Sequence, residues 1–512
     1  MLGEFHLENS HKIKTKALVM MIFSSIFGFA NTTVAYYQMG YASIFWYILA
    51  ALFFFLPSSL MFAEYGASFK EAKGGIYSWL EGSIGEKPAF IGTFIWLSSW
   101  VIWLVSTSSK VWIPLSALIF GHDATQSWTL FGLNSTQTIG LLGIVWILFV
   151  AFTTTHGADF VAKVSSLGGT CIVILDVIFL IASLVVWIGN HGALAQPISG
   201  ISSFFRSPNP SFGSSLALIS FVIYAVFAYG GMESMGGIMD DIDKPEKTFP
   251  KALTISTLII TVGYALMIFF WGISSNWKTD LGGSQVNLGN ITYILMNNLG
   301  IQLGSALGLS HATGLVFGNI MTRFAGIGMF MGYLGAFFVL IYSPIKSFII
   351  GSDSRLWPAK LTKMNKHNMP ANAMWLQTAI VAVFIFLVAF GGSAAQKFYT
   401  ILTDMANVST TFPYLFLVGA FPFFKKRQDL KRPYEIYNNK TFTNFIVTII
   451  LIILAGGIIF TCVQPIIEHD YQTAFWTMIG PIFFGIVAWA FYSYSEKKIA
   501  KEDTSVTVKP QK

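Results

Sequence analysis

The chain has 512 residues, of which 54% are hydrophobic and only 11% are charged. Soluble domains carry about 25% charged residues, so a soluble enzyme of this composition could not cover its surface with polar groups. Because the charges lie in short stretches between apolar segments, the net charge of +7 indicates membrane topology rather than nucleic-acid binding.

Twelve apolar segments follow one another along the chain, each near or above the length that crosses about 30 Å of hydrocarbon. They lie at residues 17–38, 42–65, 89–119, 137–154, 164–189, 214–238, 251–273, 318–343, 373–392, 396–424, 441–463 and 473–493. We therefore predict an all-α integral membrane protein with twelve transmembrane helices. A polar N-terminal tail (1–16) precedes them, and a polar C-terminal tail (495–512) without regular structure follows.

The basic residues predict the orientation in the membrane. If the N-terminus is cytoplasmic, all but five of the 31 lysines and arginines fall on the cytoplasmic side. The exceptions are Lys110, Arg206, Lys278, Arg323 and Lys397. This bias predicts a plasma-membrane protein with both termini in the cytoplasm, and adding or dropping a helix early in the chain would destroy it.

Two segments contain small and polar residues at membrane depth. The first carries Ser24, Ser25 and Gly28, and the sixth carries Gly230 and Gly231 followed by Glu233. Broken helices survive in a bilayer only where the freed backbone faces protein or a water-filled cavity. Breaks at matching places in two halves indicate a transporter with inverted repeats. The repeats would be residues 17–189 and 214–424, with two further helices at 441–493.

The ends of broken helices suit a zwitterion. A helix N-terminus presents free N–H groups that favour a carboxylate, and a helix C-terminus presents free carbonyls that favour an ammonium group. Two breaks that face each other therefore predict a site for an α-amino acid. For Gly236 and Gly237 we favour the alternative that they only permit close helix packing.

Three motifs resemble those of the amino acid/polyamine/organocation transporter superfamily. Residues 227–234 (FAYGGMES) resemble the signature F-x-(F/Y)-x-G-x-E-(S/A), and 243–252 (DKPEKTFPKA) resemble the cytoplasmic N-P-x-(K/R)-x-(V/I)-P-(K/R)-A loop. Residues 63–67 (AEYGA) and 74–79 (GGIYSW) resemble a third conserved element. More closely, the chain is similar to bacterial inner-membrane permeases of the YjeM type, near the glutamate/γ-aminobutyrate antiporters.

The resemblance implies a LeuT-like five-plus-five inverted repeat and amino acid transport. It assigns substrate binding to the two breaks, with Ser25 replacing a glycine found in many members. The residues expected to bind the substrate are Ser24, Ser25, Ile26, Phe27, Gly28, Phe227, Tyr229, Gly230 and Gly231.

Four charged residues are candidates for gating or proton coupling. Glu233 lies at the second break and could instead only cap freed N–H groups. In some members of the superfamily a lysine at the place of Lys163 substitutes for bound sodium, the alternative being a lysine that extends to the membrane surface. Asp176 and Asp404 fall inside spans, where each could relay protons or simply stay protonated in the core.

Other polar and aromatic residues receive a structural interpretation. We expect Lys110 and Arg323 to extend to the membrane surface, and Trp100 and Trp103 to pack in the interior. The two cysteines, Cys171 and Cys462, offer neither a disulfide framework nor a metal-ligand spacing, so no metal and no cofactor is expected.

These observations predict a secondary transporter of an amino acid or close derivative that works by alternating access, driven by protons or by exchange. The alternatives are a polyamine or organic-cation transporter and, with less support, a receptor or channel. The expected partners are the substrate, protons and lipid, whereas the oligomeric state is left open. No motif of an enzyme or of an ATP-driven pump is present in the sequence.

Overall fold

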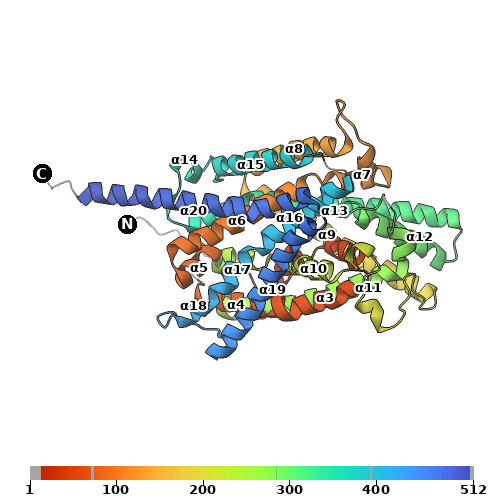
Figure 1. The fold of residues 1–512 in the computed structure, drawn as a ribbon, viewed down its shortest axis with the longest axis horizontal. Coiled ribbons are helices and arrows are strands. Elements are labelled where there is room, and N and C mark those ends of the chain that lie inside the picture. The colour runs from red at the N-terminus through yellow and green to blue at the C-terminus, as the bar shows by residue number, and fades with distance from the viewer. Residues whose placement is uncertain (1–12, 71–73, 284, 393–394, 508–512) are drawn as a thin grey trace, which may run out of the picture.

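The structure is a computed structural model that describes residues 13–70, 74–283, 285–392 and 395–507 (Figure 1). Regular structure in these ranges is helical, apart from one isolated bridge between Ile13 and Ile242. A helix satisfies its backbone hydrogen bonds within one segment, which a stretch of chain in lipid requires.

The longer helices follow the apolar segments of the sequence. They are α3 (Ala42–Ala50), η1 (Ala51–Phe55), α4 (Leu56–Ser68), α6 (Glu86–Ser108), α7 (Trp112–Phe120), α8 (Ser135–Thr154), α9 (Ala158–Gly189), α10 (Ser215–Phe227), α11 (Pro245–Ser274), α13 (His311–Gly351), α15 (Ala371–Ala389), α19 (Lys440–Ile467) and α20 (Tyr471–Thr507). Within the described ranges they form ten stretches that are long and apolar enough to cross a membrane. The prediction of an all-helical, multi-pass membrane protein is confirmed.

The expected first and tenth spans are helical but interrupted. The first consists of α1 (Thr15–Ile26) and α2 (Phe29–Met39), and the tenth of α16 (Ala395–Thr411), α17 (Pro413–Gly419) and α18 (Phe421–Lys426). Each piece is shorter than the roughly 20 residues that a span needs by itself. The total of twelve spans and the five-plus-five repeat therefore stay predictions.

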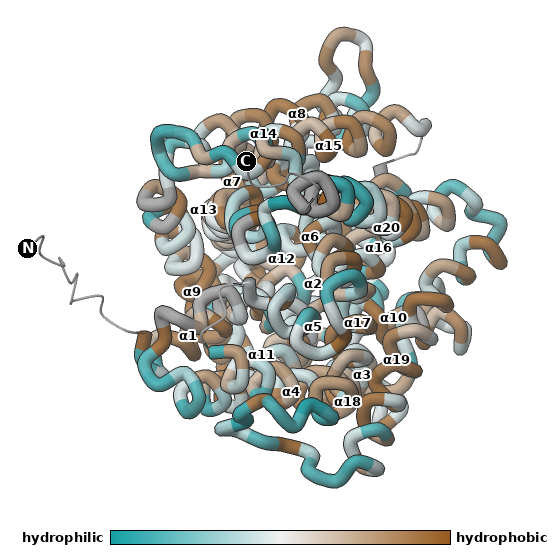
Figure 2. The backbone as a smooth tube through the Cα atoms, turned by 90° about the vertical axis from the view of Figure 1, so that its left-hand side faces the viewer, coloured by the Kyte–Doolittle hydropathy of each residue, from teal (hydrophilic) through white to brown (hydrophobic). Residues whose placement is uncertain are grey.

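Short helices connect these elements. They are α5 (Ile76–Ile84), η2 (Thr125–Ser127), η3 (Ile201–Phe204), η4 (Pro210–Phe212), η5 (Met232–Asp241), η6 (Trp277–Leu281), α12 (Ile291–Ala306), η7 (Ser354–Leu356) and α14 (Ala359–Thr362). Figure 2 colours the chain by the hydropathy of each residue and shows that the most hydrophilic stretches lie mainly in connecting segments. Large apolar side chains such as Val262, Ile452 and Ile486 are more than half exposed, which suits contact with lipid.

Helix α20 continues beyond the membrane segment and protrudes from the end of the bundle where α14 and α5 lie (Figure 1). The prediction of an unstructured tail is therefore wrong for residues 495–507, whereas 508–512 lie outside the described residues. The Ser495 hydroxyl donates to Leu356 O at 2.8 Å, which anchors the helix as it leaves the bundle. Beyond it, Glu, Lys and Ala residues with high helix propensity extend a helix that is already nucleated.

Candidate functional site

The first break separates α1 from α2. Helix α1 ends at Ile26, Phe27 and Gly28 have extended backbone conformations, and α2 begins at Phe29. Before the break, the Ser25 hydroxyl donates to Met21 O at 2.6 Å. Such bonds to the carbonyl one turn earlier weaken and bend helices, so Ser25 favours an interruption here.

The second break follows α10. After Phe227 the chain leaves the α-helix, passes through Gly231 and continues as the tighter helix η5. Gly231 has a φ of 112°, in the region that residues with a Cβ rarely adopt. The sequence therefore places glycine where the backbone requires it.

The two breaks meet in space. A Cβ atom added at Gly231 would lie 3.3 Å from Ser25 O, so the breaks are in direct contact. The hydroxyl of Tyr264 on α11 joins them. It accepts from Gly28 N at 3.0 Å and from Asn31 Nδ2 at 3.2 Å. It lies 3.0 Å from Ile26 O on the first break and 2.8 Å from Ala228 O on the second, and its single proton can be donated to either.

Removing this hydroxyl by the substitution Tyr264→Phe should loosen both breaks. One of the two carbonyls loses its donor, the Gly28 N–H and the Asn31 amide lose their acceptor, and each such loss costs about 1–3 kcal/mol. We expect substrate transport to fall at least about tenfold and the protein to unfold at a lower temperature. Transport and thermal unfolding of the purified variant measure this, with Tyr494→Phe as the control because Tyr494 is 72% exposed. A Tyr264→Phe variant that matched the control in both would contradict the role of the hydroxyl.

Glu233 is buried directly after the second break and accepts from three donors. Its Oε1 accepts from Trp96 Nε1 on α6 at 3.1 Å. Its Oε2 accepts from Gly231 N at 3.1 Å and from the Tyr414 hydroxyl on α17. The Tyr414 hydroxyl also accepts from Gly231 N at 2.9 Å. This Glu233 cluster, defined as Glu233, Trp96, Tyr414 and Gly231, joins the second break to α6 and α17.

Most of the residues predicted to bind substrate lie around the two breaks. Around the breaks, Phe27 stacks on the ring of Tyr264 with centroids 4.6 Å apart, and Ile26 is buried. Gly28, Phe227 and Gly230 are half-buried there. The ring of Tyr229 also contacts Tyr264, with centroids 5.4 Å apart, while its hydroxyl donates to Tyr47 O on α3 at 3.1 Å. The side chain of Ser24 lies outside the described residues.

The other predicted charges do not gather at the breaks. Lys163 is exposed on α9. Asp176, further along the same helix, is buried, and neither of its carboxylate oxygens has a hydrogen-bond partner among the described residues. Asp404 lies on α16 beside Thr403. Among the described residues, Glu233 is therefore the one candidate of the four that hydrogen bonds join to a break.

Lys110 lies in the turn between α6 and α7, where its Nζ donates to Thr403 Oγ1 at 2.9 Å. The turn directs the lysine toward α16, and its extension to the membrane surface stays a prediction. Arg323 is held in a similar way, as its Nη1 donates to Leu118 O and Ile119 O at the end of α7.

Sequence analysis did not identify Tyr264, Trp96 or Tyr414. Trp96 precedes Trp100 and Trp103 on one face of α6, so the spacing of the tryptophans was a visible signal. Tyr414 follows Pro413 inside a predicted span, and a proline there marks an interruption. Tyr264 is followed by apolar residues, and nothing beside it in the sequence marks it as part of a site.

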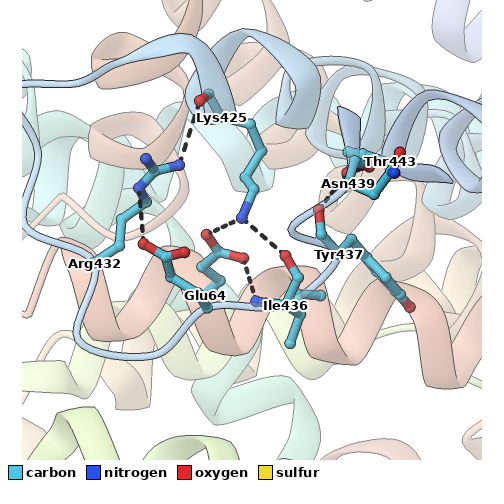
Figure 3. A network of polar contacts seen from close by, with 8 residues as sticks. Glu64, Lys425, Arg432, Ile436, Tyr437, Asn439 and Thr443 are labelled. Carbon is cyan, nitrogen blue, oxygen red and sulfur yellow. Dashed lines mark hydrogen bonds and ion pairs between the residues drawn. The ribbon is translucent and has the colours of Figure 1, made fainter. Parts of the chain in front are cut away.

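A second polar network, the Glu64 clamp, joins α4 to α18 and to the segment that follows α18 (Figure 3). We define it as Glu64, Lys425 and Ile436. Glu64 is fully buried in α4, where its Oε1 accepts from Lys425 Nζ at 2.8 Å and its Oε2 from Ile436 N at 3.0 Å. Lys425 also donates to Ile436 O at 2.8 Å. The glutamate of the AEYGA motif thus holds the segment 427–439 against α4 and α18.

Comparisons with known proteins agree with this architecture. The family model described as amino acid permease matches residues 13–491. The chain is 47% identical over 496 residues to the inner membrane transporter YjeM of Salmonella typhimurium, covering 96% of this chain and 98% of that relative. It is 45% identical over 491 residues to the inner membrane transporter YjeM of Escherichia coli K12, covering 96% of this chain and 97% of that relative.

A more distant relative carries a substrate in its name. The glutamate/gamma-aminobutyrate antiporter of Lactococcus lactis subsp. lactis is 23% identical over 448 residues, covering 87% of this chain and 82% of that relative. The resemblance predicted from the three motifs is confirmed, and the chain belongs to the amino acid permease family of membrane transporters.

Proposed function

We propose that the protein is a secondary active transporter that carries an α-amino acid or a close derivative between the two helix breaks. The observation that supports this most is the contact of the breaks at Gly231 and Ser25 together with the Tyr264 hydroxyl that joins them. The start of α2 offers N–H groups for a carboxylate, and the ends of α1 and α10 offer carbonyls for an ammonium group. The names of the amino acid permease family and of the Lactococcus antiporter support the same substrate class.

Alternating access requires contacts that open on one side of the substrate and close on the other. We assign one such contact to the Glu233 cluster, because it connects the second break to α6 and α17 through three donors to one carboxylate. Separating α17 from the break would remove the Tyr414 hydroxyl from Glu233, and separating α6 would remove Trp96. In this proposal the inverted repeats comprise residues 17–189 and 214–424, and both termini are cytoplasmic.

For the coupling proton we favour Glu233 and Asp176 over the other two candidates. Both are buried, and Asp176 has no described hydrogen-bond partner to hold it ionised. A carboxylate in such surroundings needs a proton or a change of partner during transport. Lys163 is exposed and Asp404 is only half-buried, so neither needs a proton to remain in its surroundings as much as a fully buried carboxylate does.

Uptake into proteoliposomes tests the proposal. Purified protein would be reconstituted, loaded with unlabelled amino acids, and offered labelled amino acids, γ-aminobutyrate and polyamines with and without a pH gradient. We expect exchange or accumulation of at least one α-amino acid or close derivative. Uptake of polyamines alone would favour the organic-cation alternative, and no uptake under any gradient would contradict secondary transport of either class.

A further inference from the structure

A groove lies at the end of α11 that faces the segment 427–439. It has a volume of about 520 Å³ and is lined by Glu246, Lys247, Pro250, Lys251, Thr254, Ile255, Pro433 and Tyr434. One wall is therefore the first part of a membrane-spanning helix, and the other is a connecting segment. The groove is separate from the helix breaks.

The charge of the groove is suited to an anion. Lys247 and Lys251 are one turn apart on α11 and both are exposed. Glu246 also lines the groove, but its carboxylate forms an ion pair with Lys70 at 3.7 Å. The two lysines are thus left to attract an anionic group.

The groove continues into an apolar strip on the outside of the bundle. Beyond Lys251 and Ile255, the same face of α11 carries Leu258, Val262 and Leu266, which are 58%, 65% and 42% exposed. Their spacing of three to four residues aligns them along one side of the helix. A ligand with an anionic head and an apolar tail would match both parts.

The Glu64 clamp holds the second wall of the groove. Ile436, whose N–H donates to Glu64, is two residues from Tyr434 and three from Pro433 (Figure 3). Burial and the nearby Glu64 charge raise the pKa of Tyr434. The Tyr434 hydroxyl therefore stays protonated at neutral pH and can donate to a phosphate oxygen.

We propose that this groove binds an anionic phospholipid of the membrane, with its phosphate at Lys247 and Lys251 and an acyl chain along Leu258, Val262 and Leu266. Basic pockets at the ends of membrane helices bind anionic lipid head groups by this charge complementarity. A zwitterionic phospholipid carries its own ammonium group beside the phosphate, so the two lysines favour the anionic class. The bound lipid would contact the segment that the Glu64 clamp holds.

Native mass spectrometry of the purified full-length protein in detergent tests this proposal. Dioleoyl-phosphatidylglycerol would be titrated against the wild type, against Lys247→Gln/Lys251→Gln, and against Lys360→Gln/Lys363→Gln. The last pair removes two exposed lysines from α14 and the residue after it. We expect the first pair to bind phosphatidylglycerol roughly thirtyfold more weakly than wild type, since two lysines near a lipid surface each contribute on the order of 1 kcal/mol. The second pair should bind like wild type.

Further arms separate the possible sources of the anion. Dioleoyl-phosphatidylethanolamine should bind more weakly than phosphatidylglycerol, and glycerol 3-phosphate and inorganic phosphate should compete poorly because they lack an acyl chain. Charge reversal in Lys247→Glu/Lys251→Glu should weaken phosphatidylglycerol binding further. Wild-type binding by the Lys247→Gln/Lys251→Gln variant, equal binding of the two phospholipids, or full competition by either soluble phosphate would overturn the proposal.

Discussion

The substitution Gly231→Leu is expected to abolish transport while leaving membrane insertion intact. Gly231 has a φ of 112°, and a side chain in left-handed backbone costs roughly 1–2 kcal/mol. The new Cβ would also lie 3.3 Å from Ser25 O, with the rest of the leucine directed toward the first break. We expect at least about a hundredfold loss of uptake, corresponding to roughly 2.7 kcal/mol.

A matched substitution separates this effect from a general effect of leucine. Gly456 in α19 has no atom within 4 Å of an added Cβ and no positive φ, so Gly456→Leu should transport like wild type. Size-exclusion profiles of both purified variants would verify that they insert and fold. An added apolar side chain should favour insertion into the membrane. Normal uptake by Gly231→Leu would refute the location of the site at the second break.

The second large effect is expected for Glu233→Gln. An amide replaces one carboxylate oxygen by an NH₂ donor, whereas all three neighbours of Glu233 are donors themselves. In either orientation a donor would therefore face a donor, and hydrogen bonds to a charged group contribute about 1.5–3 kcal/mol each. We expect roughly a hundredfold loss of uptake in proteoliposomes.

The pattern of the loss distinguishes two roles of Glu233. If the carboxylate only holds the contact between α10, α6 and α17, both exchange and proton-driven accumulation should fall, and Tyr414→Phe should reproduce much of the effect. If it carries the coupling proton, exchange should persist while accumulation driven by a pH gradient is lost. The exposed Glu496 provides the control Glu496→Gln. Wild-type behaviour of Glu233→Gln in both assays would exclude either role.

The class of the protein and the positions of the interruptions could be predicted from the sequence. Apolar segments determine membrane insertion by their own composition, so their existence and approximate bounds are local properties. The same holds for the interruptions near Ser25 and Gly231, because a back-bonding serine and a glycine with positive φ act on the backbone at their own positions. The prediction was less accurate where a turn divides a segment, as between α6 and α7, or where a helix continues into the polar tail, as α20 does.

The partners of the site residues were decided only by the tertiary structure. Gly28 and Tyr264 are 236 residues apart, and nothing near Tyr264 in the sequence indicates that its hydroxyl reaches both breaks. Glu64 and Lys425 are likewise joined only because α4 packs near α18. Conversely, the sequence did not determine whether the Lys163 side chain points into the bundle or away from it. The packing of α9 leaves this side chain exposed. A hydrogen bond across the bundle forms only if the two helix faces that carry its donor and acceptor pack together. Which faces pack together is determined by the arrangement of all the helices, not by the sequence of either one alone.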